Sequence, residues 1–107
     1  MTSGHLRRGD VVLTRFPFTD LSGSAVRPAV VVSQGQIADD VVLMAVSSVV
    51  RHPFATNDIV CDATHQEFAA TGLKVTSVLR SLKLVAVETK VLTRRLGCLG
   101  PLLQAPR

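Results

Sequence analysis

A few polar side chains interrupt otherwise apolar segments, and these are the residues whose types could do chemistry. Arg27 directly precedes a proline and a run of four apolar residues. Ser47 and Ser48 follow a second apolar run, and Ser77 and Arg80 lie in a third. Guanidinium and hydroxyl groups bind phosphate and stabilise the charge that develops on it. They can also promote a reaction whose nucleophile belongs to the substrate, as the 2′-hydroxyl of RNA does. The alternative is structural, with Arg27 in an ion pair and the serines as hydrogen-bonding residues at strand ends.

Other reactive side chains form no recognisable group. His52 and His65 stand thirteen residues apart, a spacing that indicates no shared site, and His5 is near the terminus. Cys61 and Cys98 are too few for a disulfide framework and lack metal-ligand spacing. We therefore expect no metal site and no cofactor.

Short β-strands are the elements that must position the polar residues. Valine dominates the apolar runs, which favours strands over helices. Arg27 is expected to be held extended at the entrance of its strand, because the following Pro28 restricts its backbone. The expected strands are 10–16, 29–32, 41–50 and 58–62, with one or two more in 74–86.

The remaining segments give weaker patterns. Residues 63–72 are the best helical candidate, with Gly72 as a plausible stop. Periodicity does not decide between a strand and a helical turn for 88–96. Glycines and prolines in 98–107 predict a short, non-helical tail. We therefore expect one domain over 1–107, with tails at 1–7 and 98–107. Its class is mainly β, a small curved sheet or partial barrel with few short helices.

Charge is distributed unevenly along the chain. Residues 1–70 hold five Lys and Arg against seven Asp and Glu, whereas residues 71–107 hold seven against one. This asymmetry favours a polyanionic partner such as a nucleic acid, although unevenly placed solubilising charge or an acidic protein partner would give the same pattern. No stretch is long and apolar enough to span a membrane, and the N-terminal residues are polar, so we expect a cytoplasmic protein.

Residues 8–33 also carry a resemblance to a known family. They read RGDVVLTRFPFTDLSGSAVRPAVVVS and resemble the N-terminal signature of the MazF/PemK toxins of type II toxin–antitoxin systems. That pattern comprises a Gly-Asp-Val start, an FPFTD-type loop and an Arg-Pro that leads a hydrophobic strand. The later segments VLMAVSS, GLKVTSVLRSLKL and RRLGCL resemble the family's following strands. The match spans roughly residues 8–99, and its first block is the most specific.

The resemblance implies a fold, an activity and partners. The fold is an SH3-like β-barrel of the MazF/PemK/CcdB type with a few short helices, usually a homodimer. The activity is that of an mRNA interferase, an endoribonuclease that cleaves single-stranded mRNA at a short sequence without a metal ion and so inhibits translation and growth. The partner is a cognate MazE-like antitoxin with a disordered C-terminal segment.

The same resemblance assigns roles to individual residues. Arg27 matches the family's catalytic arginine, and Ser47 falls where many relatives carry a catalytic threonine; its neighbour Ser48 could share that role. The 2′-hydroxyl would attack the adjacent phosphorus and leave a 2′,3′-cyclic phosphate and a 5′-hydroxyl. Arg27 would stabilise the phosphorane, because its high pKa makes it a poor general base. Specificity would reside near 17–26 and 51–57. The residues assigned to substrate binding are Phe16, Phe18, Thr19, Ser48, His52, Ser77 and Arg80.

Two other hypotheses stay open. The first is a non-enzymatic, CcdB-like poison that binds gyrase; such a toxin needs no phosphate-binding arginine and places critical residues in a C-terminal helix, which the expected tail lacks. The second is a catalytically inactive member that binds RNA or antitoxin. The absent Trp and Tyr leave few rings for base stacking, and a shortened C-terminal segment could weaken the fold, the dimer or the antitoxin groove.

Overall fold

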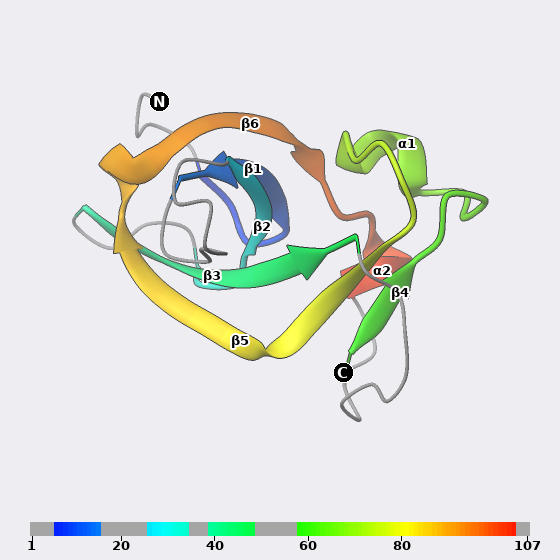
Figure 1. Cartoon of the computed structure of the whole chain (residues 1–107), viewed down its shortest axis with the longest axis horizontal. Coiled ribbons are helices and arrows are strands. Elements are labelled where there is room, and N and C mark those ends of the chain that lie inside the picture. Colours follow the sequence, from blue (N-terminus) through cyan, green and yellow to red (C-terminus); the bar gives the residue numbers. More distant parts are fainter. Residues whose placement is uncertain (1–5, 16–25, 35–38, 49–57, 105–107) are drawn as a thin grey trace.

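Six antiparallel strands and two short helices make up the described part of the chain (Figure 1). The structure is a computed structural model that describes residues 6–15, 26–34, 39–48 and 58–104. The elements are β1 (Asp10–Thr14), β2 (Arg27–Val31), β3 (Asp40–Ser47), β4 (Ile59–Cys61), α1 (Phe68–Thr71), β5 (Ser77–Glu88), the 3₁₀ turn η1 (Thr89–Val91), β6 (Leu92–Cys98) and α2 (Pro101–Gln104).

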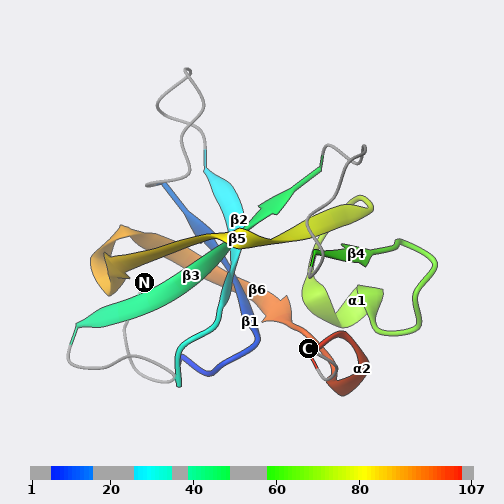
Figure 2. The ribbon, with the colours of Figure 1, turned by 90° about the horizontal axis from the view of Figure 1, so that it is seen from below.

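The strands form one sheet in the order β4-β5-β3-β2-β1-β6. β5 and β6 are long and joined only by η1, so they bend around β1, β2 and β3 and curl the sheet into a half-barrel (Figure 1). Figure 2 shows β4, α1 and α2 grouped at one end of this barrel. The mainly β class that we expected is confirmed.

Both faces of the central strands are buried, which explains why their sequences are continuously apolar. Val12, Val31 and Leu43 belong to one core cluster. Their neighbours Val11, Val30 and Met44 point to the opposite face and belong to a second cluster. That second cluster also contains residues of the two helices, Phe68 and Leu103. The helices therefore cover this second face of the same strands.

Gly9 and Asp10 hold the start of β1 in place. Gly9 has a positive φ of 95°, donates its N–H to the Val31 carbonyl and accepts a hydrogen bond from the Leu99 N–H. The buried Asp10 carboxylate accepts the Arg7 N–H at 2.9 Å and pairs with Arg95 at 3.2 Å. The Gly-Asp pair thus joins β1 to β2 and β6, which makes its role structural.

Helix α1 lies against β6 through two glycines. Gly72 ends the helix in the left-handed conformation (φ 76°), which confirms the expected stop at this residue. A Cβ on Gly72 would lie 2.4 Å from the Leu96 carbonyl oxygen, and a Cβ on Gly97 would lie 2.1 Å from the Ala70 carbonyl oxygen. Only glycine permits this approach of α1 to β6.

Several expectations about local structure need correction. The expected helix is shorter, since only residues 68–71 are helical after turns at 63–67. Residues 77–88 form a single strand, and 88–96 combine the 3₁₀ turn with the start of β6.

The expectation of a non-helical tail was wrong, because Pro101–Gln104 forms a helical turn. Proline suits the first turn of a helix because its missing N–H needs no partner there. The Leu102 and Leu103 N–H groups donate to the Glu67 carboxylate at 3.2 and 3.0 Å. A carboxylate 35 residues earlier in the chain therefore caps α2, which no local pattern could indicate.

Candidate functional site

A cavity of about 780 Å³ opens where β2, β3, β5 and β6 meet the segment that follows α1. Its walls combine apolar and cationic side chains. The lining residues are Leu13, Arg27, Pro28, Ala45, Val46, Ser47, Ser48, Gly72, Leu73, Lys74, Val75, Ser77, Arg80, Lys83, Arg94 and Leu96.

Five of the sequence-predicted site residues lie on this cavity: Arg27, Ser47, Ser48, Ser77 and Arg80. They come from three strands that are distant in sequence. The other four, Phe16, Phe18, Thr19 and His52, lie outside the described residues. The structure thus brings together the arginines and hydroxyls that the sequence singled out, while their roles stay predictions.

Strand register explains how these residues meet. Ser47 is opposite Val78 at the end of β3, one residue from Ser77. Ala45 is paired with Ala29 on one side and with Arg80 on the other, so Arg80 comes level with the start of β2. Arg27 itself is the first residue of β2, opposite Thr14. The start of β2, the end of β3 and the first half of β5 therefore carry the polar groups.

Three further cations on the cavity were not predicted as site residues. Leu13 of β1 is paired with Pro28 on one side and with Arg94 on the other, so Arg94 shares the cavity with the entrance of β2. Lys74 and Lys83 complete the set. The only sequence signal for them was the basic character of residues 71–107. No Asp or Glu is among the described lining residues, so the cavity presents a concentrated positive potential.

The hydroxyl groups differ in their environment. Ser77 is buried, and its Oγ donates to the Val75 carbonyl at 2.8 Å, so its proton is already used to shape the segment after α1. Ser47 is half-buried and Ser48 is exposed. Ser47 and Ser48 are therefore more accessible to a ligand than the buried Ser77.

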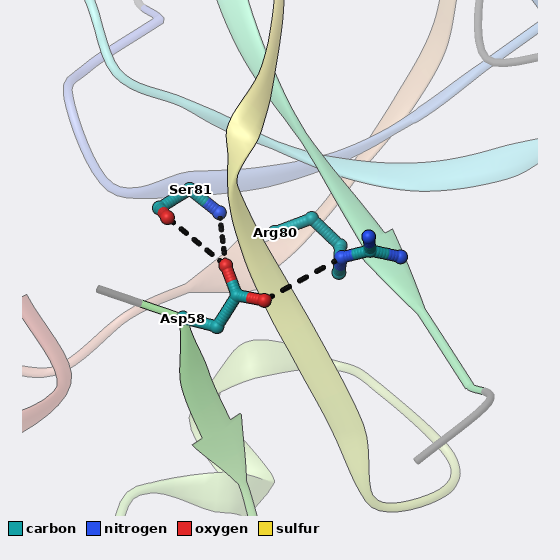
Figure 3. Close-up of polar contacts among 3 residues, drawn as sticks. All are labelled: Asp58, Arg80 and Ser81. Atoms are coloured by element: carbon teal, nitrogen blue, oxygen red, sulfur yellow. Dashed lines mark hydrogen bonds and ion pairs between the residues drawn. The ribbon is translucent and has the colours of Figure 1, made fainter. Parts of the chain in front are cut away.

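Arg80 is held by a buried carboxylate. Its Nε lies 3.6 Å from Asp58 Oδ2, and the other carboxylate oxygen, Oδ1, accepts the backbone N–H and the hydroxyl of Ser81 (Figure 3). The Asp58 side chain is only 2% exposed, whereas that of Arg80 is 41% exposed. The guanidinium is thus paired with Asp58 through Nε, while the Arg80 side chain as a whole stays partly exposed.

Cys61 lacks the features of a nucleophile. Burial, with a smaller effect of the neighbouring Asp62 charge, raises the pKa of the Cys61 thiol above its ordinary value. A raised pKa disfavours the reactive thiolate. Within the described ranges, no three His, Cys, Asp or Glu side chains lie close enough together to hold a metal ion. None of the helices in that part of the chain is long and apolar enough to cross a membrane.

Comparison with protein families agrees with the geometry. The model of the family described as PemK-like, MazF-like toxin of type II toxin-antitoxin system matches residues 7–104, which is nearly the whole chain. No curated relative matches the sequence. The matched region contains all six strands of the described part of the chain and all described residues that line the cavity. The chain therefore belongs to the PemK-like, MazF-like toxins of type II toxin–antitoxin systems.

Proposed function

We propose that this toxin is a sequence-specific endoribonuclease that cleaves single-stranded mRNA in the cavity lined by β2, β3, β5 and β6. The observation that carries the proposal is the meeting of Arg27, Ser47 and Arg80 on one cavity that has no acidic residue among its described lining. Arginine presents a fork of donors that matches phosphate, and apolar walls such as Leu73 and Val75 offer surface to a base.

The residues present suit an internal displacement. The RNA 2′-hydroxyl loses its proton to solvent water and attacks the adjacent phosphorus. The bond to the 5′-oxygen breaks, and that oxygen takes up a proton from solvent water and leaves as a 5′-hydroxyl. The other product is a 2′,3′-cyclic phosphate. Arg27 stabilises the negative charge on the phosphorane, and Ser47 donates a hydrogen bond to a non-bridging oxygen. Neither role requires a metal ion or a cofactor.

Two partners belong to the proposal. A MazE-like antitoxin with an acidic segment would be attracted to the same positive face. A homodimer is supported by apolar surface on β5, where Leu82 is 82% and Leu84 is 55% exposed. Analytical ultracentrifugation of the purified toxin, alone and with its antitoxin, measures the masses of the homodimer and of the complex and so tests both proposals.

The structure removes one objection to the gyrase-poison hypothesis and raises another. Helix α2 means that a C-terminal helical turn exists, so its expected absence no longer counts against this hypothesis. The cationic cavity still favours RNA, because a poison that binds protein needs no cluster of phosphate-binding side chains.

Mapping the products of a long RNA tests the proposal. The toxin should cleave it in EDTA at a recurring short sequence and leave 5′-hydroxyl and cyclic-phosphate ends. An oligonucleotide with 2′-deoxyribose at the scissile nucleotide should resist cleavage, because the nucleophile is missing. Cleavage of that oligonucleotide, or activity that only Mg²⁺ restores, would refute the mechanism.

A further inference from the structure

We infer that Asp58 is a positioning residue that aims Arg80 into the cavity as a second phosphate-binding arginine beside Arg27. This inference rests on the proposed function, since it specifies how the same site holds RNA. Asp58 itself does not line the cavity and has the wrong charge to bind phosphate.

The pairing of β5 with β3 is irregular next to Arg80, and Asp58 binds β5 at this irregularity. Met44 of β3 is paired with Leu84, but the next residue, Ala45, is paired with Arg80. Residues 81–83 therefore bulge out of the β3–β5 ladder, which re-aims the side chains around them. The Ser81 N–H finds its partner in Asp58 Oδ1 at 2.8 Å, and the Ser81 hydroxyl joins it at 2.9 Å. Asp58 thus accepts the hydrogen bonds of a bulge residue.

The same carboxylate orients the guanidinium. Ile59 is paired with Leu79, so Asp58 lies across from Arg80 one step further along the antiparallel ladder. Its Oδ2 faces Arg80 Nε at 3.6 Å. The two terminal nitrogens of Arg80 point away from Asp58 (Figure 3), and Arg80 lines the cavity together with Lys83 of the bulge. Held by Nε, the arginine offers its terminal nitrogens to phosphate.

A positioning role for Asp58 and a purely electrostatic role predict opposite changes in RNA affinity when Asp58 is neutralised. Asp58 is a negative charge beside a site for a polyanion, so its neutralisation should tighten RNA binding if it acts only through its field. If Asp58 orients Arg80, its neutralisation should weaken binding despite the gain in positive charge. The Asp58→Asn variant separates the two, because Asn keeps an oxygen for Ser81 and presents an NH₂ to Arg80 Nε.

The experiment is a double-mutant cycle on binding of a fluorescent 2′-O-methyl RNA, which lacks the nucleophile and is not cut. We expect Arg80→Ala to weaken binding about tenfold, as for the loss of a hydrogen bond to a charged group. Asp58→Asn should weaken it about three- to tenfold in the wild-type background and have no effect in the Arg80→Ala background. Both single variants should lower the salt dependence of binding, since fewer phosphates are neutralised.

Each other outcome contradicts the inference. Unchanged or tighter binding by folded Asp58→Asn overturns it, and so does an equal loss in both backgrounds, which would mean a structural role. Arg80→Lys gives a second test that leaves Asp58 intact: it keeps the charge but lacks Nε and the fork, so wild-type binding by this variant also refutes positioning. A wild-type toxin that binds no RNA overturns the proposed function and this inference together, whereas the other results leave the proposed function standing.

Discussion

The contact between α1 and β6 gives the sharpest test of how the fold builds the cavity wall. Gly97 of β6 is buried, and a Cβ there would lie 2.1 Å from the Ala70 carbonyl oxygen and 2.8 Å from that of Thr71, where ordinary contacts begin at 3.4 Å. The obstacle is backbone, which cannot rotate away. Gly97→Ala should therefore push α1 off β6 and move Gly72 and Leu73 at the cavity.

The cost can be worked from these distances. Forcing extra volume into a packed site costs about 1–3 kcal/mol, and an overlap of this size on backbone belongs at the upper end. Alanine regains about 0.4–1 kcal/mol by restricting the unfolded chain. The net loss of unfolding free energy should be about 2 kcal/mol, or a fall in melting temperature of about 10 °C for a domain of this size.

Gly100→Ala is the matched control. Its Cβ would also overlap a neighbour, at 2.3 Å, but the neighbour is the carboxyl carbon of the Glu67 side chain, which can rotate. Gly100→Ala should lower the free energy of unfolding much less than Gly97→Ala does. In a Glu67→Ala background it should not lower this free energy at all, because the overlapping carboxyl group is absent. Urea unfolding monitored by circular dichroism measures the free energy of unfolding of Gly97→Ala, of Gly100→Ala and of Gly100→Ala in the Glu67→Ala background. If Gly97→Ala proved as stable as Gly100→Ala, the close approach of α1 to β6 would be refuted.

Three further predictions concern single side chains. In native protein at pH 8 a thiol reagent should label the half-buried Cys98 before Cys61, whose pKa is raised by burial; faster labelling of Cys61 in mass spectra of the peptides would contradict its environment. The Thr64 N–H and hydroxyl lower the pKa of Asp62 below its ordinary value. A lowered folded-state pKa gives stability that is present above the unfolded value and lost as pH falls through the folded one; the stability difference between wild type and Asp62→Asn should thus shrink in acid, and a pH-independent difference would show that the carboxylate charge is irrelevant. Glu67→Ala should cost about 1 kcal/mol, as other lost helix caps do, and a chemical-denaturation midpoint equal to wild type would show that α2 does not need its cap.

Much of the fold could be predicted because its determinants are local. The apolar runs around Val30 and Leu43 indicate strands buried on both faces, Arg27-Pro28 marks where β2 begins, and Gly72 marks where α1 ends. What could not be predicted depends on contacts between distant residues. Helix α2 follows a glycine and is capped by Glu67, which is remote in sequence.

The residues of the candidate site likewise fall into those that the sequence indicates and those that only distant contacts bring to the site. Arg27, Ser47 and Arg80 stand out as polar groups in apolar strands, so the sequence singles them out. Arg94 joins them only through its register with Leu13, which composition does not reveal. Asp58 directly precedes the short strand β4 and resembles any turn residue in the sequence, whereas the structure places Ser81 and Arg80 of β5 against it.

We propose that RNA is cleaved in the cavity lined by Arg27. The most direct test compares single-turnover cleavage of one mapped oligonucleotide by Arg27→Ala with that by Lys90→Ala. Lys90 is a matched control, since it is an exposed cation that pairs with Glu88 and does not line the cavity. We predict a loss of about 10²–10³-fold for folded Arg27→Ala, the cost of removing one group that stabilises transition-state charge, and little change for Lys90→Ala. Cleavage by folded Arg27→Ala at the wild-type rate would show that the cavity is not the site of RNA cleavage.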